Sequence, residues 1–401
     1  MTTKKNCYFL ILILASAYNS IYSLAFMKGL YYTLIQSGLG LSHFQLGQLY
    51  SSFGLFSMFS YLGGAFFLNR FERWKLLSGS SLIVGILTIC LATLPSYPVI
   101  LIIFGIIGFL IGSTFYPAHL EVLHQIGDLQ NQGAVFGMFF VFNSIFGILF
   151  AFIGFGISSL DFPTSSRMQF LLLFFALLNF IGFILSAIFL RKLPSDTVTK
   201  SSLSLKGIKK LLQNKRLWLV ILIVASNYIC YSSMNYIFPY LENVFHLPSN
   251  INNILSIVRL YCIAIIAAPI AGKITDKIHS ASKLMGLSFS LYSITIFIML
   301  LCFRRNLIGS FLCILLFCLF VNMGKSMALI TIDEAKIPPN LYGMAISVIS
   351  FSAYSPDAFY YSLSGKILDC SPAHGYEYIF MIAAVISLLG FITTQILNRT
   401  K

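Results

Sequence analysis

Acidic side chains are scarce in this chain, and charged residues of both signs are few. Only 12 of the 401 residues are Asp or Glu, and charged residues make up 9% of the sequence while hydrophobic residues make up 58%. A soluble domain needs a wetted, charged surface, so this composition excludes one. It is typical of a helical bundle whose outer face meets lipid.

The sequence also lacks the residue patterns of an embedded enzyme or a metalloprotein. Seven of its eight cysteines lie within or at the ends of apolar runs, so no disulfide framework or metal-ligand spacing is visible. His119 and His124 are five positions apart, which places them on different helix faces. No His-Glu-x-x-His or Gly-x-Ser-x-Gly sequence occurs. We therefore expect no catalytic residues, no cofactor and no metal.

What the sequence has instead is a series of long apolar runs. Each holds roughly the 20 apolar residues that cross about 30 Å of hydrocarbon at about 1.5 Å per residue. The twelve runs cover residues 8–36, 44–68, 76–94, 99–123, 134–158, 169–190, 217–241, 251–271, 284–303, 307–331, 341–365 and 378–397. They predict an all-α membrane protein with twelve transmembrane helices.

Lys and Arg are distributed unequally between alternate loops. If the N-terminus is cytoplasmic, 19 of the 26 basic residues fall in cytoplasmic segments and 4 in outside loops. Positively charged loops resist translocation, so both termini are expected in the cytoplasm. The formal net charge of +14 is then explained by topology and by contact with anionic lipid headgroups, and nucleic-acid binding is not expected.

The N-terminal run imitates a secretory signal peptide. Lys4 and Lys5 precede an apolar stretch, and Ala15-Ser16-Ala17 resembles a cleavage site. The apolar pattern continues to Leu30, which is too long for a signal core. We expect this run to be retained as the first span.

The longest polar interruption divides the spans into two sets of six. We expect an N-terminal six-helix bundle at 1–190, a cytoplasmic linker at 191–216 and a C-terminal six-helix bundle at 217–401. Within the linker, residues 203–212 can form a short basic amphipathic helix on the inner leaflet. A partner-docking element is the alternative interpretation of that segment.

The two halves repeat a short motif. Ala65-Phe-Phe-Leu-Asn69-Arg70 follows the second run, and Gly272-Lys-Ile-Thr-Asp276-Lys277 follows the eighth, 207 residues further on. Internal duplication is typical of secondary transporters, in which two bundles rock around a site at their interface.

The second copy resembles the cytoplasmic signature of the major facilitator superfamily, Gly-x-Leu-x-Asp-Arg-x-Gly-Arg-Arg. The first copy departs from it, because Ala65, Asn69 and Glu72 replace Gly, Asp and Gly, although Arg70 and Arg73 remain. The resemblance covers the whole chain and implies two pseudo-symmetric six-helix bundles, transport of a small-molecule substrate by alternating access, a monomer and the inner membrane of a bacterium.

By analogy with that family, the motif residues act as cytoplasmic gates. A carboxylate at a helix end pairs with basic residues and with the N-terminal dipole of a neighbouring helix. The gating residues implied are Asn69, Arg70, Arg73, Asp276, Lys277 and Glu121. The alternative is that the basic residues only fix the cytoplasmic side of their loops and have no part in gating. Because Asn69 is uncharged, the first gate is expected to be weaker. Glu334 lies at another inner helix end and is interpreted in the same way.

Four ionisable residues are the clear cases of charge within apolar runs, where each costs at least about 2.5–3.5 kcal/mol. They are Lys28, Arg259, Lys325 and Asp357. Three cations and one anion leave an excess of positive charge, which a bound anion would neutralise. Arg259 is the leading candidate, since a guanidinium offers a bidentate fork to carboxylate or phosphate. A static ion pair with Asp357 is the alternative, and the two interpretations are compatible.

The other charges have alternatives of their own. Lys28 lies late in the first run and can snorkel outward, whereas Lys325 can serve binding, gating or substrate exit. Asp357 follows Pro356 on a polar stripe with Ser350, Tyr354 and Tyr361, and it is the candidate carrier of a coupling proton. A permanent salt bridge is again the alternative. The sequence around Ser355-Pro356-Asp357 also resembles a narrower bacterial group within the superfamily.

Uncharged polar residues on helix faces complete the predicted substrate site. They are Tyr18, Tyr22, Asn143, Asn227, Tyr231 and Asn235. Such side chains suit a small polar solute, although each tyrosine can equally serve helix–helix packing.

These observations favour a secondary active transporter of a small organic anion or zwitterion, with a proton as candidate coupling ion. A drug or cation efflux antiporter is the second hypothesis, but the fifth run lacks the Gly-Pro pattern of that branch and the charge excess has the wrong sign. A membrane receptor or scaffold that does not transport is the alternative of another class.

Overall fold

The structure is a computed structural model that describes residues 4–61, 63–126, 132–192, 209, 211–302, 306–328, 330–337 and 341–400. Every regular element in these ranges is helical.

The chain divides into two compact units. Unit 1 comprises Met1–Leu41 and Gln48–Ser201, and unit 2 comprises Ser42–Gly47 and Ser202–Lys401. The predicted domain boundaries stay a prediction, and most of the predicted linker and its amphipathic helix lies outside the described residues.

Nine of the predicted spans coincide with helices that are long and apolar enough to cross a membrane, counted over the described residues. Three of them contain a short irregular turn. The nine are α6 (Arg73–Ala92), α7 with η1 and α8 (Tyr97–Ile126), α9 (Gln132–Ser158), α10 (Thr164–Phe189), α12 with η3 and α13 (Lys215–Phe245), α14 with η4 and α15 (Ser249–Ile278), α16 (Ala281–Cys302), α17 (Leu307–Met327) and α20 (Gly375–Arg399).

The three other predicted spans are each divided into shorter helices. Run 8–36 forms α1 (Lys4–Ile21), α2 (Ser23–Met27) and α3 (Tyr32–Gly38); run 44–68 forms α4 (His43–Ser60) and α5 (Gly64–Arg70); run 341–365 forms α18 (Tyr342–Ala353), η7 (Ser355–Ala358) and α19 (Tyr360–Cys370). Glycine and proline explain two of the breaks, since Gly63 and Gly64 start α5 and Pro356 lies within η7. The twelve-span count and the cytoplasmic termini stay predictions.

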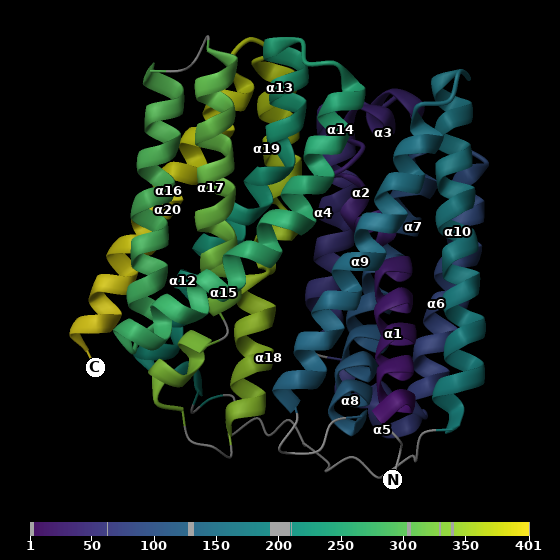
Figure 1. Cartoon of the computed structure of the whole chain (residues 1–401), viewed down its shortest axis with the longest axis horizontal. Helices are drawn as coiled ribbons and strands as arrows, with labels where there is room; N and C mark the ends of the chain where they lie inside the picture. Colours follow the sequence, from purple (N-terminus) through teal and green to yellow (C-terminus); the bar gives the residue numbers. More distant parts are fainter. Residues whose placement is uncertain are drawn as a thin grey trace. The chain divides into compact units, whose positions relative to one another are not determined.

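In unit 1, α6 packs along α10, and α1 contacts both α9 and α10 (Figure 1). Polar side chains connect these helices inside the apolar packing. Asn179 of α10 is fully buried and donates to the carbonyl oxygen of Ser20 on α1 at 3.0 Å. Such hydrogen bonds fix how neighbouring helices meet, because lipid offers their polar groups no partner.

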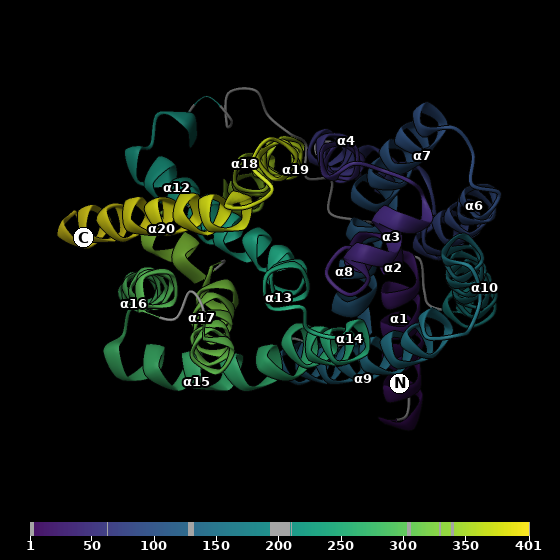
Figure 2. The same cartoon turned by 90° about the horizontal axis from the view of Figure 1, so that it is seen from above.

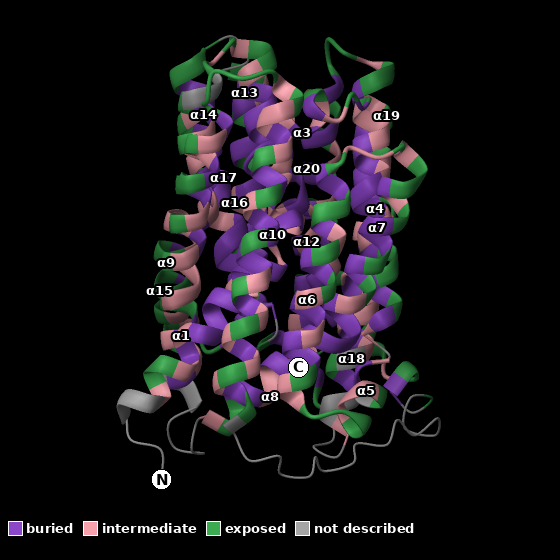
Figure 3. Ribbon diagram, turned by 90° about the vertical axis from the view of Figure 1, so that its right-hand side faces the viewer, coloured by how far each residue is buried: buried purple, intermediate pink, exposed green. Residues whose placement is uncertain are grey.

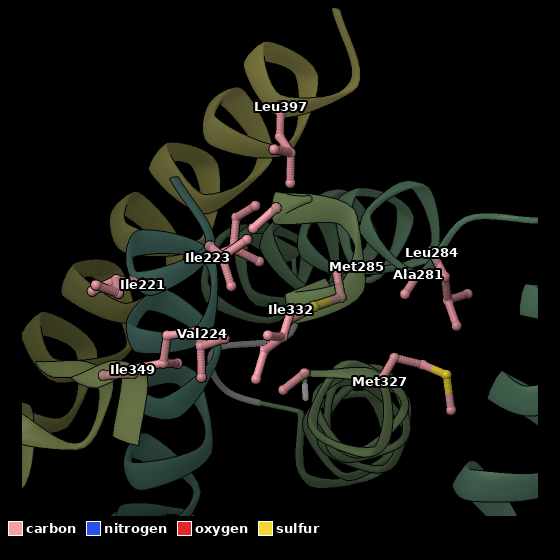
Figure 4. Packing of buried hydrophobic residues seen from close by; sticks show 14 of the residues in the cluster. Ile221, Ile223, Val224, Ala281, Leu284, Met285, Met327, Ile332, Ile349 and Leu397 are labelled. Carbon is pink, nitrogen blue, oxygen red and sulfur yellow. The ribbon is translucent and has the colours of Figure 1, made fainter. Parts of the chain in front are cut away.

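In unit 2, α16 packs against α17 and α20, while α12 contacts α20 and α15 contacts α17; Figure 2 shows this unit from above. A cluster of buried aliphatic side chains lies between these helices. Figure 4 shows Ile223 and Val224 of α12 with Met285 of α16, Met327 of α17 and Ile332 of η5 (Ile330–Ala335). This packing makes the unit a rigid support for the polar residues described below.

The outward faces of the helices are apolar as well. Exposed stretches recur along the helices in Figure 3. Among the exposed large apolar side chains are Leu301, Ile308 and Phe140, whose exposed fractions are 80%, 73% and 62%. Large apolar side chains in contact with solvent would be unfavourable in water. They are the surface expected of helices that contact lipid chains.

Unit 2 includes the first turn of α4, which is fixed to α19. Asp369 accepts hydrogen bonds from the backbone N–H groups of His43 and Phe44 at 3.1 and 2.8 Å. Two glycines allow the close approach: a Cβ on Gly47 would lie 2.1 Å from the Tyr361 carbonyl oxygen, and one on Gly365 would lie 2.2 Å from that of His43. The carboxylate satisfies N–H groups that have no partner within their own helix.

Candidate functional site

Arg259 lies in a π-helical turn, η4 (Val258–Cys262), in the middle of its span. Its side chain is 3% exposed, and Nη1 donates to the carbonyl oxygen of Met234 at 2.7 Å. Met234 begins η3 (Met234–Tyr236), a 3-10 turn that separates α12 from α13. The guanidinium also lies 5.4 Å from the ring centroid of Phe238. Two irregular turns therefore meet at the buried guanidinium of Arg259. Irregular turns within helices are frequent at functional sites.

Asp357 lies in the 3-10 turn η7, between the two halves of the divided span. Its Oδ2 accepts a hydrogen bond from the Tyr228 hydroxyl of α12 at 2.5 Å. This distance is typical of a charge-assisted O–H···O⁻ bond. The hydroxyl thus holds the carboxylate toward α12, and the ring of Tyr354 packs edge-on against Tyr228.

Lys325 lies near the end of α17, and its Nζ is 3.6 Å from the ring centroid of Tyr231 on α12. An ammonium over an aromatic face is attracted by the ring quadrupole. Tyr231 is also within electrostatic range of Arg259 and Asp357. We name Arg259, Lys325, Asp357, Tyr228 and Tyr231 the charged cluster of unit 2. It carries two formal positive charges and one negative charge.

The predicted asparagines of the same span lie beside this cluster. Asn227 is buried, and a Cβ on Gly324 would lie 2.3 Å from its Oδ1, so it packs closely against α17. Asn235 donates to the Ser232 carbonyl oxygen at 3.0 Å and approaches the Tyr361 hydroxyl at 3.5 Å.

In unit 1 the predicted residues form an aromatic group with one cation. The rings of Tyr18 and Tyr22 stack with centroids 4.4 Å apart. Lys28 Nζ lies 4.6 Å from the ring centroid of Tyr50. Asn143 of α9 accepts hydrogen bonds from Asn19 at 2.8 Å through its carbonyl oxygen and at 2.7 Å through Oδ1, which connects α9 to α1.

Sequence reasoning overlooked one residue of this unit. His119 is 1% exposed and lies against Tyr18, Phe115 and Phe139. Its spacing from His124 argued only against a metal site and said nothing about a buried imidazole by itself. The sequence signal that could have identified His119 is its position within an apolar run, two residues before Glu121.

The first-half gating residues form contacts at the start of α6. Arg73 Nε and Glu121 Oε2 are 2.7 Å apart, and their side chains are 11% and 25% exposed. Beside them Lys75 and Trp74 donate to Glu72, and these hydrogen bonds lower the pKa of the Glu72 carboxyl. Arg70 lies over the ring of Phe66 at 4.5 Å. Asn69 is exposed at the end of α5.

The second-half motif residues Asp276 and Lys277 are exposed at the end of α15. The carboxylate that contacts a helix start in this unit is Glu334, which accepts from the Ser280 hydroxyl at 3.1 Å and from the Ser282 backbone N–H at 3.3 Å. Glu121 and Glu334 thus contact the starts of α6 and α16, the third predicted span of each half. The assignment of these residues to gating stays a prediction.

The Glu121 contact predicts a measurable stability effect. Replacing Glu121 by Gln is expected to lower the free energy of unfolding by about 1–3 kcal/mol, because a largely buried guanidinium loses its counter-charge. The measurement is the melting midpoint of purified protein in detergent. Glu72→Gln is the matched control, since the Lys75–Glu72 pair is about half exposed and should change the melting midpoint much less. Equal midpoints for wild type and Glu121→Gln would contradict the prediction.

The divided spans and the internal repeat are features of secondary transporters. Residues 7–360 match the family model described as Major Facilitator Superfamily, and the chain belongs to that family. It is 29% identical over 414 residues to Inner membrane protein YihN of Escherichia coli (strain K12), an alignment that covers 100% of this chain and 96% of that protein. Inner membrane protein YqcE of the same strain is 21% identical over 366 residues, covering 88% and 85%.

Solved transporter structures share the fold. A bacterial homologue of the human lysosomal transporter Spinster, inward-facing and unoccupied, has a TM-score of 0.77 at 14% identity and covers 100% of this chain and 98% of its own. The nucleoside transporter NupG has a TM-score of 0.74 at 15% identity, covering 100% of both chains. The D-xylose-proton symporter has a TM-score of 0.75 at 12% identity, covering 98% and 95%. The chain is therefore a multi-pass protein of the bacterial inner membrane with a transporter fold.

Proposed function

We propose that the protein is a secondary active transporter that moves a small organic anion or zwitterion by alternating access, with a proton as coupling ion. The observation that carries the proposal is the charged cluster of unit 2. Arg259 and Lys325 lie around Tyr231 with a single carboxylate, Asp357, so the cluster keeps a formal excess of one positive charge. An anionic solute would neutralise that excess beside Arg259, which is 3% exposed and for which an isolated charge is costly.

The chemistry of the cluster supports a carboxylate or phosphate group as the recognised part of the solute. A guanidinium presents planar donors that match such groups in a bidentate manner. The contact of Arg259 Nη1 with the Met234 carbonyl oxygen orients the fork. Tyrosine hydroxyls and Asn235 supply neutral donors and acceptors for the rest of a small polar molecule.

Asp357 supports the proposed coupling to protons. Its carboxylate lies in a helix break, the kind of position at which transporters hold coupling ions. Tyr228 donates to the ionised form, and protonation would remove the negative charge from the cluster. Solute binding and proton binding would then change the net charge of the same small region.

The alternative functions make different demands on the cluster. A cation exporter would need a carboxylate excess, which these residues do not provide. A receptor or scaffold without transport activity requires no solute exchange at all. The names of the relatives and of the structural neighbours do not supply a substrate for this chain.

Solute counterflow in proteoliposomes tests the proposal. Wild-type protein would be reconstituted with each of a set of unlabelled organic acids, sugar phosphates, amino acids and organic cations inside. Uptake of the same labelled compound from outside is then measured. We expect exchange of at least one anion or zwitterion and none of the cations. Exchange restricted to cations, or no exchange of any compound by correctly folded protein, would contradict the proposal.

A further inference from the structure

His119 occupies the interior of unit 1, directly after an irregular turn. The π-helical turn η1 (Ile111–Phe115) interrupts the span, and α8 (Tyr116–Ile126) continues it with His119 in its first turn. Phe115 is fully buried and Phe139 is 4% exposed. The imidazole is thus enclosed by η1 of its own span, by α1 through Tyr18 and by α9 through Phe139.

Three aromatic rings surround the imidazole. The Phe115 ring is nearly parallel to it, at 8° and a centroid distance of 5.9 Å. Tyr18 and Phe139 lie closer, at 5.2 and 4.7 Å, with interplanar angles of 44° and 56°. We name Tyr18, Phe115 and Phe139 the aromatic cage of His119. Aromatic faces are electronegative and attract a cation held near them.

The imidazole has a buried polar atom without a partner. Nδ1 of His119 has no hydrogen-bond partner among the described residues. Leaving such a group unsatisfied costs about 1–3 kcal/mol, whereas a phenyl ring would fill the same space at no such cost. Packing alone therefore does not explain a histidine at this position. An imidazole adds one property that a phenyl ring lacks, the ability to bind a proton near neutral pH.

We propose that His119 binds and releases a proton during the transport cycle, as a second proton site separate from the charged cluster of unit 2. This inference rests on the proposed transport function. The aromatic rings occupy the space around the imidazole, so the ligand that fits without repacking is a proton. The proton passes from water to a ring nitrogen and later returns to water, and no other bond changes.

Protonation of His119 would favour a conformation other than the one described. An imidazolium within an aromatic cage gains cation–π attraction but lacks an acceptor for the N–H at Nδ1 among the described residues. A conformation that brings water or a polar group to the ring would therefore bind the proton more tightly. A ligand that binds one conformation better shifts the population toward it, so external pH would act on the transport cycle through this residue.

The charged and titratable neighbours of His119 are few. Tyr18 faces it from α1, with Tyr22 stacked behind, and apolar rings face it from η1 and α9. On α6, which also packs on α8, Arg73 is paired with Glu121 of α8 itself. On α5, the basic residue is Arg70, which lies over Phe66. These two cations thus have partners of their own.

Nitrogen NMR of the full-length protein tests the inference directly. Protein labelled with ¹⁵N-histidine in lipid nanodiscs would be titrated from about pH 5 to pH 8, the range in which imidazole groups titrate. His119→Gln identifies the His119 signals, and His119→Asn serves if the first variant does not fold. We expect the His119 signals to change from the neutral to the imidazolium pattern. Signals that stay neutral throughout, with and without an exchanged solute, would overturn the inference.

The pH profile of counterflow gives a second readout. We expect wild-type exchange to change by about tenfold per pH unit at most near the titration midpoint, and His119→Gln to flatten this step. His124→Gln, a change on the same helix outside the cage, should keep the wild-type profile. If no compound is exchanged, the proposed function fails while the NMR titration still decides the role of His119. An unchanged profile in His119→Gln with normal exchange contradicts the inference alone.

Discussion

Replacing Arg259 by Gln is expected to weaken solute binding by at least about 100-fold and to abolish counterflow at ordinary solute concentrations. A hydrogen bond to a charged group contributes about 1.5–3 kcal/mol, and the fork can make two of them. Since about 1.4 kcal/mol corresponds to a factor of ten, losing both exceeds two orders of magnitude. The measurement is counterflow of the solute that the wild type exchanges, together with its binding affinity.

Arg259→Lys separates charge from geometry. An ammonium keeps the positive charge but cannot present a planar pair of donors, so we expect intermediate binding, about tenfold weaker than wild type. Because Arg259 also donates to the Met234 carbonyl oxygen, the melting midpoint of each variant must be measured beside transport. Arg167→Gln is the matched control, since Arg167 belongs to unit 1 and contacts Ser158 and Thr164, none of which is a member of the cluster. Wild-type exchange by a folded Arg259→Gln variant would remove Arg259 from the site.

Replacing Asp357 by Asn is expected to uncouple transport from protons. The amide has nearly the shape of the carboxylate but cannot bind a proton, so exchange should persist while accumulation against a gradient is lost. With one proton per solute, a gradient of one pH unit supports about tenfold accumulation by the wild type. The variant should reach equal concentrations on both sides. The measurement is uptake into proteoliposomes with an imposed pH gradient.

Tyr228→Phe tests the contact that holds this carboxylate. Removing the hydroxyl deletes a hydrogen bond to a charged group, so we expect weakened rather than absent coupling. Tyr378→Phe, on the exposed face of α20, provides the control. If Asp357→Asn accumulates solute as well as the wild type, Asp357 does not carry the coupling proton. If the wild type itself ignores the gradient, proton coupling fails and solute exchange remains to be judged separately.

Much of the fold could be predicted from the sequence because a bilayer imposes a simple rule on helix length. Nine apolar runs are confirmed as long apolar helices within the described residues. The divisions of the other three runs were harder to predict. Pro356 gave a local signal for one break, whereas the glycines before α5 are common enough in membrane helices to indicate little by themselves.

The candidate site could be predicted in part for a similar reason. Arg259, Lys325 and Asp357 were identifiable because charge within an apolar run is costly and therefore unusual. Their partners were not, since the Met234 carbonyl oxygen and the Tyr228 hydroxyl are selected by how helices pack. His119 was overlooked because an ordinary histidine is mostly uncharged at pH 7 and so does not stand out within an apolar run. Its significance depends on the rings around it, which come from three separate segments.

The π-helical turn at Val258–Cys262 has a consequence for how its span tolerates insertions and deletions. A π-turn is equivalent to one additional residue in an otherwise regular helix. Because the turn absorbs that residue, deleting one residue there would restore uniform winding and leave the helix beyond it in nearly the same orientation. Deleting a residue from the regular helix α15 would instead rotate everything beyond it by about 100°, so Asp276 and Lys277 would emerge on a different side. A shortened chain could therefore keep every functional group and still lose their common alignment.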